Sequence, residues 1–102
     1  MADTAEFFSD YLPRKLAANP ELRAAGGVYQ FDITGAGTWS VDLGDSSVTE
    51  GPHHAPGCKI STDKATWEAI LDTPSKAAQM FMMGKMKATN IGMAMKLQKI
   101  LG

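Results

Sequence analysis

The sequence predicts an α+β fold, in which a five-stranded, antiparallel-dominated sheet is covered by helices on one face. Three observations lead to this class. Apolar residues recur every three or four positions near the N-terminus and again in the last third of the chain, as they do on amphipathic helices. Between these regions, apolar and polar residues alternate, as they do on strands with one buried face. Strands and helices that are each apolar on one side bury those sides against one another in two layers.

Length and composition indicate a single domain over residues 1–102. The chain has 44% apolar and 21% charged residues, which is ordinary for a globular protein. It contains no apolar run near the roughly 20 residues of a membrane-spanning helix. The acidic N-terminus starts no apolar run, so we expect no secretory signal and a cytoplasmic location. The one cysteine, Cys58, cannot form an internal disulfide, which fits a reducing compartment.

The first expected element is a helix that begins after Asp3 or Thr4, either of which can cap it. Its apolar stripe has helical spacing and consists of Phe7, Phe8, Tyr11, Leu12 and Leu16. Pro13 falls inside this stripe, and its ring would clash with the carbonyl group of Ser9, so we expect a kink or a break there. Residues 19–27 then predict one short helical turn that a pair of glycines ends.

Four strands are expected in the middle of the chain. Residues 28–33 and 38–43 alternate on either side of a glycine-bearing turn, which is typical of a β-hairpin. Residues 47–50 form a shorter third strand and residues 58–61 a fourth. The loop between them, residues 51–57, contains two prolines and two glycines, which oppose strand pairing. The side chains expected on the inward face are Tyr29, Phe31, Ile33, Trp39, Val41, Leu43, Cys58 and Ile60.

Two helices are expected after the fourth strand. The first covers residues 62–72, is capped by one of its first two residues, and buries an apolar side made of Trp67, Ile70 and Leu71. The second covers residues 73–83, with Thr73 as its cap and Pro74 at the first helical position, where no amide proton is needed. A glycine ends it.

The last two expected elements are a strand and a helix. Residues 85–89 alternate, with Met86 and Ala88 inward and lysines outward. Asn90 caps a final helix over residues 91–101. Its apolar stripe consists of Met93, Leu97, Ile100 and Leu101.

Six of the seven methionines lie in one segment, residues 80–95. Methionine adapts to irregular apolar shapes, whereas leucine, with better defined rotamers, fills a fixed core better. Small residues are interspersed or lie close by, namely Ala77, Ala78, Ala88, Gly92 and Ala94. Large flexible side chains alternating with small ones can form the wall of an apolar cavity. The alternative is a core that uses methionine as filler.

Charge is distributed unevenly along the chain. Residues 1–72 carry all eleven acidic residues and a net charge of −6, whereas residues 73–102 carry five lysines and a net charge of +5. Such asymmetry can mark an anionic surface as a partner, and we expect Lys96 and Lys99 to dock on anionic membrane headgroups. The alternative is that the lysines line solvated faces. Nucleic acid is disfavoured because the basic third has no arginine and no run of basic residues.

Candidate catalytic and metal-binding groups are few. His53, His54 and Cys58 form the only cluster of soft ligands, but their spacing matches no known zinc pattern and no fourth ligand is evident. The sequence contains no nucleophile elbow and no phosphate-binding glycine loop. We therefore expect no metal, no cofactor and no enzymatic activity, and we expect Cys58 to be a buried structural thiol.

The segment FMMGKMKATNIGMAMKLQKIL, residues 81–101, resembles the C-terminal signature of the sterol carrier protein type-two family of lipid-binding domains. That signature is a Gly-Lys-apolar-Lys strand followed by an apolar-Ala-Met-Lys-Leu helix. The strands VYQFDITG and WSVDL, the segment VTEGP and the helix in CKISTDKATWEAIL also resemble the family, so the similarity runs from about Phe7 to Leu101. One departure is the missing glycine before the last helix, where Thr89 runs straight into Asn90.

The resemblance implies an apolar tunnel between sheet and helices. It also implies non-enzymatic binding of fatty acids, fatty acyl-CoA, sterols or phospholipids. Carried onto this chain, the lipid-binding wall comprises Ile33, Trp39, Trp67, Ile70, Leu71, Met80, Phe81, Met83, Met93 and Leu97. The chain ends in Lys-Ile-Leu-Gly rather than in a Ser-Lys-Leu-type peroxisomal address, which favours a stand-alone cytoplasmic form or a domain of a longer chain.

Two alternatives to a lipid carrier remain at this point. The methionine-rich surface could receive a partner helix or make a homodimer, and the sequence leaves monomer and homodimer open. A small hydrolase or metal enzyme built on His53, His54 and Cys58 is the other. Co-purifying lipid, a concentration-dependent mass, and replacement of the three soft ligands distinguish the three hypotheses.

Overall fold

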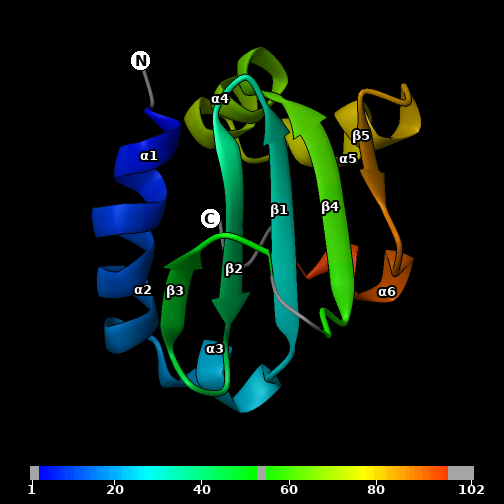
Figure 1. Cartoon of the computed structure of the whole chain (residues 1–102). Helices are drawn as coiled ribbons and strands as arrows, with labels where there is room; N and C mark the ends of the chain where they lie inside the picture. Colours follow the sequence, from blue (N-terminus) through cyan, green and yellow to red (C-terminus); the bar gives the residue numbers. More distant parts are fainter. Residues whose placement is uncertain (1–2, 53–54, 97–102) are drawn as a thin grey trace.

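The computed structural model describes residues 3–52 and 55–96, apart from the side chain of Ala25. Its centre is one five-stranded sheet. The strands are β1 (Val28–Thr34), β2 (Gly37–Asp42), β3 (Ser47–Glu50), β4 (Cys58–Asp63) and β5 (Met86–Ala88). They are arranged in the order β3-β2-β1-β4-β5, as Figure 1 shows. Neighbours pair antiparallel except β1 and β4, which are parallel, so the expected antiparallel-dominated α+β sheet is confirmed.

Helices cover one face of this sheet (Figure 1). They are α1 (Thr4–Glu6), the π-helical turn η1 (Phe7–Tyr11), α2 (Leu12–Ala18), α3 (Pro20–Ala25), α4 (Lys64–Asp72), α5 (Lys76–Met82) and α6 (Ile91–Met95). The continuous segment α1-η1-α2 contacts the β3 edge, whereas α5 and α6 contact β5 and β4 at the other edge. Helix α4 packs against β1 between them. The expected two layers, sheet and helices, are therefore present.

The first helix accommodates its proline by a change of hydrogen bonding. The amide of Leu12 donates to the carbonyl of Phe7, five residues back, which is a π-helical bond. Pro13 follows at the start of α2, where its missing amide proton is tolerated. The disruption expected at Pro13 therefore takes the form of a π-helical turn just before it, and the chain stays helical.

The alternation of the strands is confirmed on the inward face. All eight side chains expected there are buried: Tyr29, Phe31, Ile33, Trp39, Val41, Leu43, Cys58 and Ile60. On the opposite face, Lys59 Nζ lies 3.2 Å from a carboxylate oxygen of Asp32. Gln30 and Ser40 of that face are also buried. Their polar groups are hydrogen-bonded, since the Gln30 amide donates to Asp32 and the Ser40 hydroxyl donates to the carbonyl of Gly51. The outer face is thus polar but not fully wet.

The boundary between α4 and α5 differs from the prediction. Asp63 caps α4 as expected, since its carboxylate accepts the Thr66 amide at 2.7 Å. Thr73, predicted as the cap of α5, instead ends α4 by donating its amide to the carbonyl of Ala69. The prediction was wrong because a turn separates Thr73 from α5. In this turn the Lys76 amide donates to the carbonyl of Thr73 and the Ala77 amide to the carbonyl of Pro74, so α5 begins only at Lys76.

The last helix begins where the sequence predicts. The Asn90 side chain accepts the amide of Met93 at 3.0 Å and so caps α6. No intervening glycine is needed, because Asn90 adopts the extended backbone of a cap residue itself. The predicted continuation of the helix through residues 97–101 lies outside the described residues.

Candidate functional site

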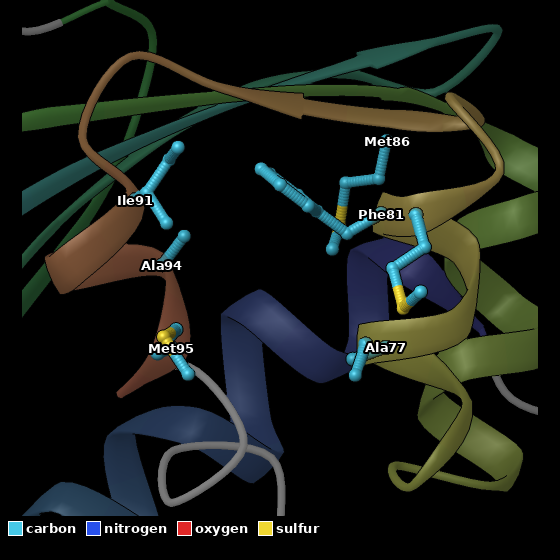
Figure 2. A pocket seen from close by; sticks show the side chains of 8 residues that line it. Ala77, Phe81, Met86, Ile91, Ala94 and Met95 are labelled. Atoms are coloured by element: carbon cyan, nitrogen blue, oxygen red, sulfur yellow. The ribbon is translucent and has the colours of Figure 1, made fainter.

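An apolar pocket of about 260 Å³ lies between α5, β5 and α6. All of its lining side chains are apolar: Ala77, Ala78, Phe81, Met82, Met86, Ile91, Ala94 and Met95. Figure 2 shows Phe81 and Met86 directed into the space from α5 and β5, with Ile91, Ala94 and Met95 on α6 opposite them. Such a lining favours an apolar ligand without selecting one by hydrogen bonds.

Helix α5 supplies one wall of the pocket. Ala77 and Phe81 lie four positions apart, as do Ala78 and Met82, so all four share one face of the helix. The two alanines leave space that longer side chains would fill. The space is therefore a consequence of pairing small residues with a large one on the same helical face.

Strand β5 supplies the pocket's inner surface. Met86 pairs with Thr62 of β4, and alternation turns its side chain inward, where it is buried. The Thr62 hydroxyl donates to the carbonyl of Lys85 at 2.9 Å, which adds a side-chain bond to this edge strand. The same alternation turns Lys87 to the outer face.

Helix α6 is held against the sheet by two polar contacts. The Tyr29 hydroxyl of β1 donates to the carbonyl of Met93 at 2.8 Å, and the Cys58 thiol lies 3.5 Å from the carbonyl of Asn90. Burial, with a smaller contribution from neighbouring Cys58, raises the pKa of Tyr29 to about 12. Burial also raises the pKa of the Cys58 thiol. Both groups are therefore neutral at physiological pH, and Cys58 is the buried structural thiol that the sequence predicts.

The Met93 side chain adds an apolar contact on the side of α6 that faces the sheet. A Cβ atom placed on Gly27 would lie 2.9 Å from Met93 Cε, and one placed on Gly57 would lie 3.1 Å from it. Glycine at these two positions therefore leaves the room that Met93 occupies. Met93 anchors α6, which leaves Ile91, Ala94 and Met95 for the pocket.

The pocket opens to solvent through unusually exposed apolar side chains. Met82 is 86% exposed, Met95 76% and Ile91 59%, while Met86 at the inner surface is only 4% exposed. The lining thus extends from a buried inner surface to a solvent-exposed rim. An apolar ligand can enter at that rim without crossing the sheet.

The predicted lipid-binding residues lie partly elsewhere. Phe81 lines the pocket, and Met83 is 56% exposed beside α5. Leu71, Met80 and Met93 are half-buried against the core. Four others are buried in the core itself, namely Ile33, Trp39, Trp67 and Ile70. Leu97 and Lys99 lie outside the described residues, and Lys96 is exposed directly after α6. Contact of these residues with a lipid, and a tunnel reaching to them, stay predictions.

The aromatic residues among these four belong to a tightly packed cluster. The Phe8 ring stacks on Trp39 at a centroid distance of 4.6 Å and on Trp67 at 5.8 Å. Phe31 packs against Trp67 at 5.3 Å. These rings fill the space between α1-η1-α2 and the sheet, whereas the pocket lies on the other side of the molecule's interior.

The sequence reasoning missed four lining residues as ligand contacts: Met82, Met86, Ile91 and Met95. A signal for two of them exists in the spacing, because Met82 lies four positions after Ala78, and Met95 four after Ile91. The small residues Ala77, Ala78 and Ala94, which indicated a cavity, do line it. Composition therefore located the pocket better than the apolar stripes did.

Within the described residues, no three His, Cys, Asp or Glu side chains come together as a metal site. His53 and His54 lie outside those residues, so the cluster they form with Cys58 is untested. Among the described residues, no helix has both the length and the hydropathy of a bilayer span.

Comparison with known sequences finds one family and one long relative. A model of the SCP-2 sterol transfer family matches residues 8–102. Hydroxysteroid dehydrogenase-like protein 2 from Xenopus tropicalis is 33% identical over 87 residues, which cover 79% of this chain and 21% of that protein. The chain thus spans about a fifth of the length of this curated relative.

Comparison with solved structures shows the same fold in proteins of distant sequence. Palmitated SCP2L2 from Aedes aegypti is 22% identical, with a TM-score of 0.79 over 94% of this chain and 92% of that one. Sterol Carrier Protein-2 from Aedes aegypti, in complex with the C16 fatty acid palmitate, is 18% identical, with a TM-score of 0.77 over 100% and 97%. At sequence identities this low, the structural similarity shows a shared fold and nothing more.

Proposed function

Because the chain belongs to the SCP-2 sterol transfer family, we propose that it binds long apolar lipids without catalysis and holds an acyl chain between α5, β5 and α6. The observation that carries this proposal is the pocket itself, which is lined by apolar side chains and is open at one side. The two Aedes aegypti proteins whose structures contain palmitate support a fatty acid as the first ligand to test.

The energetics favour an acyl chain over a small ligand. About 14 methylenes buried in an apolar site gain on the order of 11 kcal/mol, at ~0.8 kcal/mol each. Loss of ligand freedom and ordering of side chains remove several kcal/mol or more. The binding free energy that is left after these costs corresponds to a micromolar or lower dissociation constant. It depends on apolar area rather than on shape, so sterols, acyl-CoA and phospholipids are further candidates.

The pocket of about 260 Å³ is slightly smaller than the usual range for ligand sites, roughly 300–1,000 Å³. We propose that its methionines turn aside to admit a longer chain, because thioether side chains have three rotatable bonds and no branch. The predicted contacts Leu71, Met80 and Met93 are half-buried against the core. We propose that a longer acyl chain reaches these residues next.

Carrier activity without chemistry is part of the proposal. The dehydrogenase-like relative is matched over only about a fifth of its length. The reaction in its name is therefore not assigned to this chain. We propose uptake and release of an unmodified lipid as the task, in the cytoplasm.

The test is binding of a fluorescent fatty acid to delipidated protein. Ala94→Phe places a ring in the pocket, whereas Ala65→Phe places the same ring on the exposed side of α4. We expect saturable micromolar binding by the unmodified protein and by Ala65→Phe, and binding weakened about tenfold or more by Ala94→Phe. No uptake at tens of micromolar, or equal binding by both variants, contradicts the proposal. Native mass spectrometry of freshly purified protein identifies the class of any retained lipid.

A further inference from the structure

The exposed apolar surface of the described chain is concentrated at the pocket mouth. Five large apolar side chains are strongly exposed in the described residues, and four of them lie on or beside α5 and α6. These four are Met82, Met83, Ile91 and Met95. Contiguous exposed apolar side chains mark an interaction site more often than scattered ones do.

The same surface is flanked only by positive charge in the sequence. From residue 73 to residue 96 the chain contains four lysines and no acid: Lys76, Lys85, Lys87 and Lys96. Lys85 follows α5 and Lys96 follows α6, so an exposed cation stands at the C-terminal end of each pocket helix. Asp63 interacts with Lys85, so we expect Lys96 to contribute more of the available positive charge.

The N-terminal helical segment offers the opposite character. Over α1-η1-α2 and its cap, the acidic residues are Asp3, Glu6 and Asp10, and the basic residues are Arg14 and Lys15. Its exposed large apolar side chain is Tyr11, and Asp10 pairs with Arg14. This segment has a net charge of −1 and does not match an anionic surface, whereas the pocket mouth does.

We propose that the mouth formed by α5 and α6 docks on an anionic phospholipid membrane, inserting Met82, Ile91 and Met95 while Lys85 and Lys96 contact headgroup phosphates. Apolar side chains combined with lysines are the pattern of interfacial membrane binding. Each lysine near an anionic surface strengthens binding about fivefold, and salt weakens that part. The inference rests on the proposed function, because a docked mouth lets a lipid pass between bilayer and pocket without crossing water.

The experiment is sedimentation of the full chain with phosphatidylcholine vesicles, made with and without phosphatidylserine. The double variant Lys85→Glu/Lys96→Glu alters two cations beside the mouth. Arg14→Glu/Arg23→Glu makes the same charge change on exposed side chains of α2 and α3, away from the pocket. We expect binding to phosphatidylserine vesicles to fall at least tenfold in the first variant and less than about threefold in the second. Equal loss in both variants, or none in either, overturns the proposal.

Two further arms separate this surface from the alternatives. Met82→Ser/Met95→Ser is expected to weaken vesicle binding severalfold even at high salt, because insertion is apolar. Uptake of a fluorescent fatty acid from solution is expected to be unchanged in Lys85→Glu/Lys96→Glu, since neither lysine lines the pocket. A third outcome is normal fatty acid uptake by an unmodified protein that does not bind vesicles and whose mass rises with concentration. In that case the mouth is an interface between two copies, and the proposal of membrane docking is wrong.

Discussion

The two sides of the protein interior contain different kinds of side chain. Beneath β1 and β2, aromatic rings stack face to face, with Phe8 between Trp39 and Trp67. Beneath β4 and β5, methionines and alanines surround a pocket of about 260 Å³. Both sides lie between the same sheet and the same helical layer. One is filled, and the other is open to solvent.

The difference follows from the flexibility of the side chains. An aromatic ring has two rotatable bonds and a rigid plane, so stacked rings define one arrangement. A methionine has three rotatable bonds and adapts to whatever it contacts. The aromatic side therefore supplies a fixed frame, and the methionine side can change shape around a ligand at little cost to the frame. Stability and binding are thus assigned to different halves of one small core.

The largest expected effect tests this assignment with two phenylalanines. Phe8 is 1% exposed in the aromatic cluster, whereas Phe81 is half-buried at the pocket. We expect Phe8→Ala to lower the free energy of unfolding by about 3–5 kcal/mol. Phe81→Ala should lower it by only about 1 kcal/mol. Equilibrium unfolding in urea measures both. Equal losses would show that the pocket side is as important to stability as the aromatic side.

A smaller effect is expected where the frame holds α6. Tyr29→Phe removes the donor to the Met93 carbonyl and should cost about 1–2 kcal/mol of unfolding free energy. It should also speed hydrogen exchange at α6 amides, because the frame holds α6 through this bond. Tyr11→Phe, at an exposed tyrosine of the first helix, is the control and should leave both quantities nearly unchanged.

The same tyrosine gives a pH dependence. The pKa of Tyr29 is about 12 in the folded protein against an ordinary value of 10.0. Below pH 10 the hydroxyl is neutral in both states and its stabilising contribution is complete. Between pH 10 and 12 the unfolded chain releases this proton first, so the contribution is lost as the pH rises. The unmodified protein should therefore lose stability more steeply over this range than Tyr29→Phe does. Parallel profiles would contradict burial as the cause.

The smallest effect concerns oxidation of the pocket rim. A peroxide converts a thioether to a sulfoxide at a rate set by exposure, so Met82 and Met95 should oxidise before Met86. Peptide mapping by mass spectrometry gives the order. Binding of the fluorescent fatty acid should weaken about fivefold, since the sulfoxides make an apolar rim polar. Met82→Leu/Met95→Leu should keep its binding under the same treatment. Oxidation of Met86 first would show that the pocket is open more widely than the structure indicates.

Much of the secondary structure and of the buried strand face could be predicted from the sequence. Alternation placed Tyr29 and Phe31 inward. Side-chain chemistry identified Asn90 as a helix cap and reduced the cap of α4 to Thr62 or Asp63. Both signals depend on local geometry. The cap predicted at Thr73 was wrong because a turn through Pro74 and Ser75 separates Thr73 from α5, and side-chain chemistry alone does not tell where the α-helical bonding begins. The π-helical turn before Pro13 was not specified by any apolar spacing, since a helix can absorb a proline in more than one way.

The pocket was harder to predict than the frame. Periodicity assigns a side chain to a face of its helix or strand, but it does not tell how far the facing layer lies. Trp67 and Phe81 both point inward, yet one meets aromatic rings and the other meets a space. That distance depends on where α5 and α6 sit over β5, which is a property of the whole fold. The alternation of methionine with alanine was the local feature of the sequence that indicated this space.

The most direct test of the central claim is nuclear magnetic resonance of the methionine methyl groups, labelled with carbon-13, during titration with a C16 fatty acid. The methyl signals of Met82, Met86 and Met95 are expected to shift and to show contacts with the acyl chain. The signal of Met83, a predicted contact that lies outside the lining, shows whether the ligand also reaches the end of α5. Saturable binding with those three signals unmoved would contradict the account, because the lipid would then occupy some other part of the molecule.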